Sequence, residues 1–187
     1  MKKLTAIMLT LMMIFSLAGC GEPEAEVPLF DWLDDTITYI EFDDGTYGFE
    51  GRIGSVMKTC WFDFTVTDAR ITEEEINGYA PSTGNALLLT DMTLTNTFTQ
   101  SIDMYTWDFY VTWGSDNENE YSYPVETDEA VTETQFPAEY TMKISQTVSG
   151  TYIFEVPAEK TDFSITFEEH FDDGTVGNAY RIYFSPQ

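Results

Sequence analysis

Residues 149–169 read SGTYIFEVPAEKTDFSITFEE, and this stretch decides the fold class. Its apolar side chains recur at every second position over residues 152–156 and again over residues 163–167. A period of two is typical of strands that bury one face, whereas a helix would repeat its apolar positions every three or four residues. The stretch therefore predicts two half-buried strands with a turn between them.

The same alternation continues on both sides of this stretch, over residues 60–66, 88–94, 105–113 and 180–184. Turn-forming sequences separate the segments, namely Asn77-Gly78, residues 81–85, residues 115–119, Phe136-Pro137 and Asp173-Gly174. A further strand is expected near residues 37–42, and ITEEEING is the one segment that predicts a helix. We therefore expect an all-β chain that folds as an immunoglobulin-like antiparallel β-sandwich.

The order of these segments carries a resemblance to a known family. WFDFTVTDARI (61–71), ALLLTDMTLTN (86–96) and WDFYVTWGSDNENEYSY (107–123) precede the opening stretch. In this order they resemble bacterial lipoproteins of unknown function with a telokin-like, immunoglobulin-like β-sandwich, a fold related in shape to a secreted actinobacterial immunoprotective antigen. Where that family often has a Leu-x-Pro-Gly-Glu turn, this chain reads FPAEYTMKISQTVSG. The resemblance implies the fold and brings no catalytic residues.

The beginning of the chain has the layout of a secretory signal. Lys2 and Lys3 precede an apolar run that is too short to span a bilayer and that ends in small residues. Leu17-Ala18-Gly19-Cys20 resembles the lipobox of bacterial lipoproteins, in which the cysteine is linked to diacylglycerol after cleavage. We expect a signal peptide at 1–19, an acidic tether at 20–35 and one sandwich domain at 36–187.

The composition limits the partners. The chain has 33 acidic residues against 8 Lys and Arg, a formal net charge of −25. Nucleic acid is excluded, because binding its backbone requires Lys and Arg that neutralise phosphates. A lipidated Cys20 cannot form a disulfide, so Cys60 is left alone. Strand alternation places Cys60 on the same face as Phe62 and Phe64, so we expect it to be buried and unpaired.

Catalytic motifs are weak in this sequence. His170 is the one histidine, no Gly-x-Ser-x-Gly motif occurs, and one His with one free Cys cannot complete a closed zinc site. Carboxylate pairs are so abundant among 33 acids that they carry little information. We expect a protein that is not an enzyme and needs no cofactor, with a carboxylate-dependent carbohydrate-active or hydrolytic accessory domain as the alternative.

Aromatic residues crowd into residues 105–123. The alternation places Tyr105, Trp107, Phe109, Val111 and Trp113 on one face, which is expected to be core and not a sugar-stacking platform. Tyr110 lies on the opposite face, beside Asp108, and is the better candidate for an exposed ring. The candidate ligand-binding residues are therefore Tyr110, Asp108, Asp116 and Glu118.

Two segments repeat the pattern F-D-D-G-T-x-G, at residues 42–48 and 171–177. Asp-Gly favours a two-residue hairpin turn in which both residues have positive φ, so we expect two hairpins. The alternative is a calcium site made by the turn carboxylates Asp43, Asp44, Asp172 and Asp173, with help from Asp116, Glu118 and Glu120. Each turn alone supplies too few oxygen ligands for Ca²⁺, so we expect no tight site.

Together these features predict a lipoprotein held by membrane lipid through Cys20 on the extracellular face of the cell membrane. Its expected role is a non-enzymatic binding or interaction module for an unknown protein or cell-envelope ligand. A pocket that holds two close, partly buried carboxylates would favour the enzymatic alternative.

Overall fold

The structure, a computed structural model, describes residues 30, 32–114 and 120–187. Cys20, Asp116, Glu118 and the expected signal peptide lie outside the described residues. Leu33–Gln187 form one structural unit. Its strands are β1 (Thr38–Glu41), β2 (Tyr47–Arg52), β3 (Met57–Lys58), β4 (Phe62–Thr72), β5 (Asn85–Asn96), β6 (Ile102–Tyr105), β7 (Phe109–Trp113), β8 (Tyr121–Ser122), β9 (Glu139–Met142), β10 (Thr147–Pro157), β11 (Phe163–His170) and β12 (Val176–Phe184), and a 3₁₀ helix, η1 (Thr106–Asp108), separates β6 from β7.

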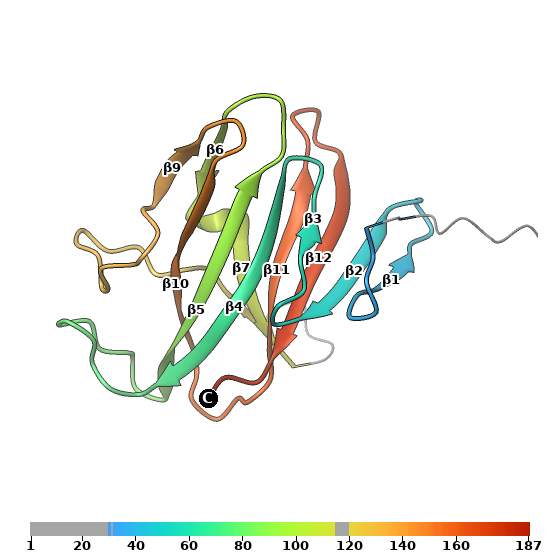
Figure 1. Ribbon diagram of the computed structural model, residues 1–187. Helices are drawn as coiled ribbons and strands as arrows, with labels where there is room; N and C mark the ends of the chain where they lie inside the picture. The colour runs from blue at the N-terminus through green and yellow to red at the C-terminus, as the bar shows by residue number, and fades with distance from the viewer. Residues whose placement is uncertain (1–29, 31, 115–119) are drawn as a thin grey trace, which may run out of the picture. The chain divides into compact units, whose positions relative to one another are not determined.

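The strands form two main sheets that face each other, and Figure 1 shows β4 and β5 in front of β7. One sheet has the order β1-β2-β12-β11-β7-β8, the other the order β10-β5-β4-β3, and β6 pairs separately with β9. The predicted all-β sandwich is confirmed. One pair departs from the antiparallel prediction, because β2 runs parallel to β12 with Tyr180 beside Phe49.

The core lies between the two sheets and is rich in phenylalanine. Phe64 of β4 meets Phe109 of β7 edge to face, with ring centroids 5.2 Å apart, and Phe62 meets Phe167 of β11 at 4.8 Å. These residues occupy the alternating positions that the sequence assigned to one face of each strand. Such aromatic pairs add about 0.5–1.5 kcal/mol beyond the area that they bury.

A smaller cluster explains why β5 contains the continuous apolar run Ala86–Leu89. Leu88 faces the main core, whereas Leu87 and Leu89 pack on the other side of the sheet against Val131 and Ile153. Both faces of β5 are therefore buried at this end, and the loop that carries Val131 supplies the cover. A strand covered on two sides needs no alternation of apolar and polar residues.

The predicted helix at residues 71–78 is wrong. Residues 71 and 72 continue β4, and Ile76 pairs with Tyr79 around a tight turn at Asn77 and Gly78. Both turn residues have positive φ, at 47° and 89°, which Asn-Gly favours because neither residue is strongly strained there. The turn preference of Asn-Gly outweighs the weak helical pattern of three consecutive glutamates.

Cys60 is exposed, so the prediction that it is buried is wrong. The Thr59 hydroxyl accepts hydrogen bonds from the amides of Trp61 and Phe62, and this turn rotates the chain just before β4 begins. The strand alternation therefore starts at Phe62 and does not include Cys60. Partial desolvation of the thiol and the charge of Glu169 raise the pKa of Cys60 to about 12, so it stays protonated at neutral pH.

The two F-D-D-G-T-x-G segments form hairpin turns of one geometry, between β1 and β2 and between β11 and β12. In each turn the glycine amide donates to the phenylalanine carbonyl, and the phenylalanine amide donates to the threonine carbonyl. The loop thus has three residues, with positive φ at Gly45 and Gly174 only, and the predicted two-residue geometry is wrong. A Cβ on the last glycine of either segment would collide with the phenylalanine ring of that segment.

Candidate functional site

A 3₁₀ helix interrupts the aromatic segment that the sequence assigned to one strand. β6 ends at Tyr105, η1 takes up residues 106–108, and β7 begins at Phe109. Phe109 and Val111 are buried as predicted, but Trp107 is 56% exposed and Tyr105 is half-buried. The placement of Trp107 in the core is therefore wrong, because one helical turn rotates its indole away from the strand face.

Beside η1 lies a pocket of about 390 Å³, which we call the Trp107 pocket. The lining comes from β6, η1, β7, β11, the start of β4 with the turn before it, and the residue after β8. It combines aromatic, acidic and apolar side chains, namely Trp61, Phe62, Ile102, Asp103, Met104, Trp107, Asp108, Tyr110, Tyr123, Phe167, Glu168 and His170. The β7–β11 register, in which Phe109 pairs with Phe167, brings these elements together. A concave site with few polar groups among aromatic rings is the usual form of a small-molecule site.

Aromatic rings form much of the wall. The Trp107 indole is stacked on Tyr105, with ring centroids 4.7 Å apart and planes within 8° of parallel, so one face is covered. Tyr110 and Tyr123 meet edge to face at 6.1 Å, and Tyr123 is 47% exposed. Tyr110 is only half-buried and its hydroxyl donates to Glu168, so Trp107 is the more exposed ring of the two, contrary to the sequence interpretation.

Three carboxylates complete the wall, and each is positioned by a neutral donor. The Asp103 carboxylate accepts a hydrogen bond from the Thr141 hydroxyl at 2.7 Å, and the Asp108 carboxylate accepts one from the Tyr105 amide at 2.7 Å. Glu168 accepts from the Tyr110 hydroxyl at 2.9 Å, and its second oxygen lies 3.6 Å from Nε2 of His170. The rims of β6, η1 and β11 thus hold acidic groups in fixed positions around one hollow.

The environment raises the pKa values of two side chains that line the pocket, Asp108 and Tyr110. Burial raises the pKa of Asp108, and the hydrogen bond from the Tyr105 amide only partly opposes this rise. Burial and the neighbouring charge of Glu168 raise the pKa of the Tyr110 phenol, so it remains a hydrogen-bond donor at neutral pH. A carboxylate whose pKa is raised by burial gains free energy when a positive charge comes close.

A second hollow of about 310 Å³ adjoins the first. Its lining is Asp103, Tyr105, Glu139, Tyr140 and Thr141, from β6 and β9. Asp103 lines both hollows, and the stacked pair of Tyr105 and Trp107 contributes one ring to each.

The sequence found part of this site. Tyr110 and Asp108 do line one pocket, whereas Asp116 and Glu118 lie outside the described residues. Sequence reasoning missed Trp107, Asp103 and Glu168. The signal that could have revealed Trp107 is the Asp108 side chain, which suits the first turn of a short helix by accepting from its leading amide.

The turn carboxylates lie elsewhere, at the tips of the two hairpins. All four are exposed, and Asp44 and Asp173 each accept a hydrogen bond from the amide of the threonine two residues later. The hydrogen bonds from the Thr46 hydroxyl and the Thr46 amide lower the pKa of Asp44. Among residues 30, 32–114 and 120–187, no group of three or more His, Cys, Asp or Glu is arranged to hold a metal ion. Weak or absent calcium binding stays a prediction.

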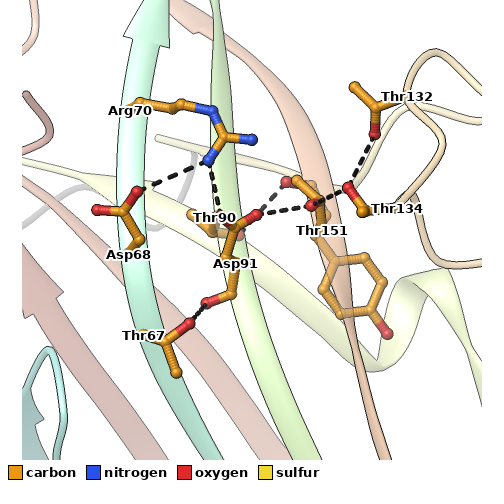
Figure 2. A network of polar contacts seen from close by, with 9 residues as sticks. Thr67, Asp68, Arg70, Thr90, Asp91, Thr132, Thr134 and Thr151 are labelled. Carbon is orange, nitrogen blue, oxygen red and sulfur yellow. Dashed lines mark hydrogen bonds and ion pairs between the residues drawn. The ribbon is translucent and has the colours of Figure 1, made fainter.

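A second polar cluster lies on the outer face of β4, β5 and β10 (Figure 2). Asp68 is directly opposite Asp91 in the β4–β5 register, and Arg70 separates these like charges with Nη1 at 3.7 and 2.7 Å from them. The other Asp91 oxygen accepts from the Thr151 hydroxyl at 2.6 Å, and Thr151 also contacts Thr134. Burial raises the pKa of Asp91, but the bonds from Thr151 and Arg70 outweigh it and lower that pKa overall. Because its groups bond one another, this cluster stabilises the sheet and offers little to a ligand.

The chain has recognisable neighbours among solved structures. It is similar to the yjhA protein of Bacillus subtilis, with 16% identity, 70% of this chain and 98% of that chain covered, and a TM-score of 0.52. It is also similar to ycdA, a candidate lipoprotein of Bacillus subtilis, with 14% identity, 68% of this chain covered and a TM-score of 0.50. The secreted protein MPT63 of Mycobacterium tuberculosis matches with 14% identity over 73% of this chain and 96% of its own, at a TM-score of 0.49.

The likenesses to yjhA and ycdA show the fold alone. This chain spans only 38% of the length of ycdA. No family model and no curated protein matches the sequence. Within the described part of the chain, no helix is long and apolar enough to cross a membrane.

Proposed function

We propose that this protein is a lipid-anchored extracellular binding module that holds a small organic ligand in the Trp107 pocket. The observation that carries the proposal is the exposure of Trp107 at the edge of a pocket that also contains three carboxylates. A large aromatic ring at 56% exposure has given up the burial that its neighbours Phe109 and Val111 obtain. Rings of this kind provide rigid contact area for a ligand at low entropic cost.

The test of binding uses the full chain purified in a nonionic detergent. Tetra-N-acetylglucosamine, tetraglucosamine, cellotetraose and spermidine would be titrated by calorimetry, with tryptophan fluorescence as a second readout because Trp61 and Trp107 both line the pocket. We expect at least one probe to bind, and expect Trp107→Ala to weaken it by about 5- to 30-fold, the range for loss of a stacking or cation contact.

The matched control is Ile144→Ala, which truncates an exposed apolar side chain outside the pocket. We expect this variant to bind like the wild type. Failure of every probe, or equal loss of affinity in the two variants, would contradict the proposed site.

The anchor is the second part of the proposal. Leu17-Ala18-Gly19-Cys20 after a short apolar run supports lipidation of Cys20, and the similarity in fold to ycdA agrees with this assignment. We expect mass spectrometry of membrane-extracted protein to show a mature chain that begins at a diacylated Cys20. Cys20→Ala is expected to abolish this species, because alanine has no thiol that can be linked to diacylglycerol. An unmodified wild-type Cys20 peptide from the membrane fraction would refute the anchor.

A second candidate function is hydrolysis by paired carboxylates. The specific observation in its favour is that Asp108, whose pKa is raised by burial, lines the same pocket as Glu168. Two carboxyl groups in one pocket, one of them with a raised pKa, are the groups that a glycosidase uses. Cleavage of an oligosaccharide probe, detected by mass spectrometry and lost in both Asp108→Asn and Glu168→Gln, would favour this candidate over simple binding.

A further inference from the structure

The charges around the Trp107 pocket have one predominant sign. Asp103, Asp108 and Glu168 are acidic, and His170 is the single basic residue among the described residues that line it. No lysine or arginine belongs to that described lining, nor to the described lining of the adjoining hollow, where Glu139 adds a fourth acid. An anionic ligand would meet repulsion here, because water is partly excluded and screening is weak.

The hydrogen-bonding capacity of the pocket carboxylates also disfavours an anionic ligand. Each of the three carboxylates accepts a bond from one neutral protein donor, the Thr141 hydroxyl, the Tyr105 amide or the Tyr110 hydroxyl. An ionised carboxylate can accept about four hydrogen bonds and donate none. The wall of the pocket is therefore rich in acceptors, and it suits a ligand that supplies several donors.

The aromatic rings provide the complementary surface. Tyr105 covers one face of the Trp107 indole, and the exposure of Trp107 leaves indole surface open to the solvent. A cation that lies on the face of a Trp or Tyr ring is attracted by the ring quadrupole, most strongly by Trp. Acidic groups beside an exposed indole thus form two independent attractions for the same positive charge.

We infer that the ligand of the Trp107 pocket carries protonated amino groups, an inference that rests on the proposed binding function. An ammonium group has three N–H donors, which suit a wall rich in carboxylate acceptors, and a positive charge, which suits the indole. The adjoining hollow shares Asp103 and contains Glu139, so a ligand with amino groups on successive units has a second place to bind. Amino sugars and linear polyamines share this chemistry.

The test compares probes with and without free amino groups. Tetraglucosamine and tetra-N-acetylglucosamine have the same sugar backbone, but only the first has free amino groups, and spermidine has amino groups without a sugar. Calorimetry would use the full chain in nonionic detergent at 0.15 M salt, where long-range attraction to the acidic surface is largely screened. We expect tetraglucosamine to bind at least about tenfold more tightly than its acetylated form. Tighter binding of spermidine than of tetraglucosamine would identify a polyamine as the source of the amino groups, and the reverse an amino sugar.

The variants separate a specific site from general attraction. Asp103→Asn keeps an acceptor for Thr141 and removes one charge. We expect it to weaken the binding of tetraglucosamine and of spermidine by about five- to tenfold. Trp107→Phe is expected to retain more affinity than Trp107→Ala. Asp172→Asn removes the same charge from an exposed hairpin tip outside the pocket, and it is expected to stay within about twofold of the wild type.

Two results would overturn the inference. If the acetylated and free-amine probes bind equally and both depend on Trp107, the pocket binds a ligand but does not select positive charge. If Asp172→Asn weakens binding as much as Asp103→Asn, the attraction belongs to the whole acidic surface and not to the pocket. Failure of all probes would instead contradict the proposed function itself.

Discussion

Glu169→Ala is expected to lower the free energy of unfolding by about 2–5 kcal/mol, because it removes the shared acceptor of three hydrogen bonds. The Glu169 side chain is 3% exposed, and one oxygen accepts from the Cys60 amide and the Tyr180 hydroxyl, both at 2.9 Å. The other oxygen accepts from the Asn178 amide at 3.1 Å. The carboxylate thereby joins the turn before β4 to the bulged start of β12. Urea unfolding measures the loss.

Two further variants make this result specific. Glu169→Gln retains one oxygen acceptor but places an amide NH₂ against a donor. We therefore expect its free energy of unfolding to lie between those of the wild type and the alanine variant. Glu159→Ala removes an exposed glutamate and is expected to change stability by less than about 0.5 kcal/mol. A change of under 1 kcal/mol in Glu169→Ala would show that water replaces the carboxylate without cost.

Phe109→Ala is expected to destabilise the protein by about 3–5 kcal/mol, the usual cost of removing a fully buried phenyl ring. Phe109 has no exposed surface, and its ring lies within 5.2–5.5 Å of those of Phe64, Phe167 and Tyr152, which come from both sheets. For a chain of this length the loss corresponds to a fall in Tm of roughly 6–20 °C. Thermal unfolding followed by circular dichroism measures it.

The matched control for Phe109 is two residues away. Trp107→Ala removes a larger ring, but from an exposed position, so we expect it to cost less than about 1 kcal/mol. If both variants lost the same stability, residues 105–113 would form one continuous strand and the 3₁₀ helix would not exist. The pair therefore tests the feature that creates the Trp107 pocket.

The sequence predicts well wherever a strand keeps one face in the core. In β4 the apolar residues Phe62, Phe64 and Val66 are buried and the residues between them are half-buried, as predicted. β11 departs from the predicted half-buried strand, because Ser164 and Thr166 are buried as well. The order of turns leads to a sandwich without further information. The parallel pairing of β2 with β12 could not be predicted, because alternation assigns residues to faces and does not identify the neighbour of a strand.

The candidate site was harder to predict, because it depends on departures from regular strands. η1 rotates Trp107 out of the core. The turn at the Thr59 hydroxyl delays the start of the alternation to Phe62, so Cys60 lies outside it. Each departure involves a single turn of chain in which one side chain accepts hydrogen bonds from the backbone, and an apolar pattern with a period of two does not reveal it. Tyr110 and Asp108 were found because both lie next to the region where the alternation is intact.

The parallel pairing of β2 with β12 also constrains how the protein folds. The Tyr47 amide donates to the side chain of Asn178, across a separation of 131 residues. β2 cannot take its place until β12 has been made, so the larger sheet is completed only after residue 184 has been added to the chain. Contacts of such long range slow folding, because the intervening chain must be ordered before they form. A chain that is still being synthesised therefore stays incompletely folded until β12 has left the ribosome.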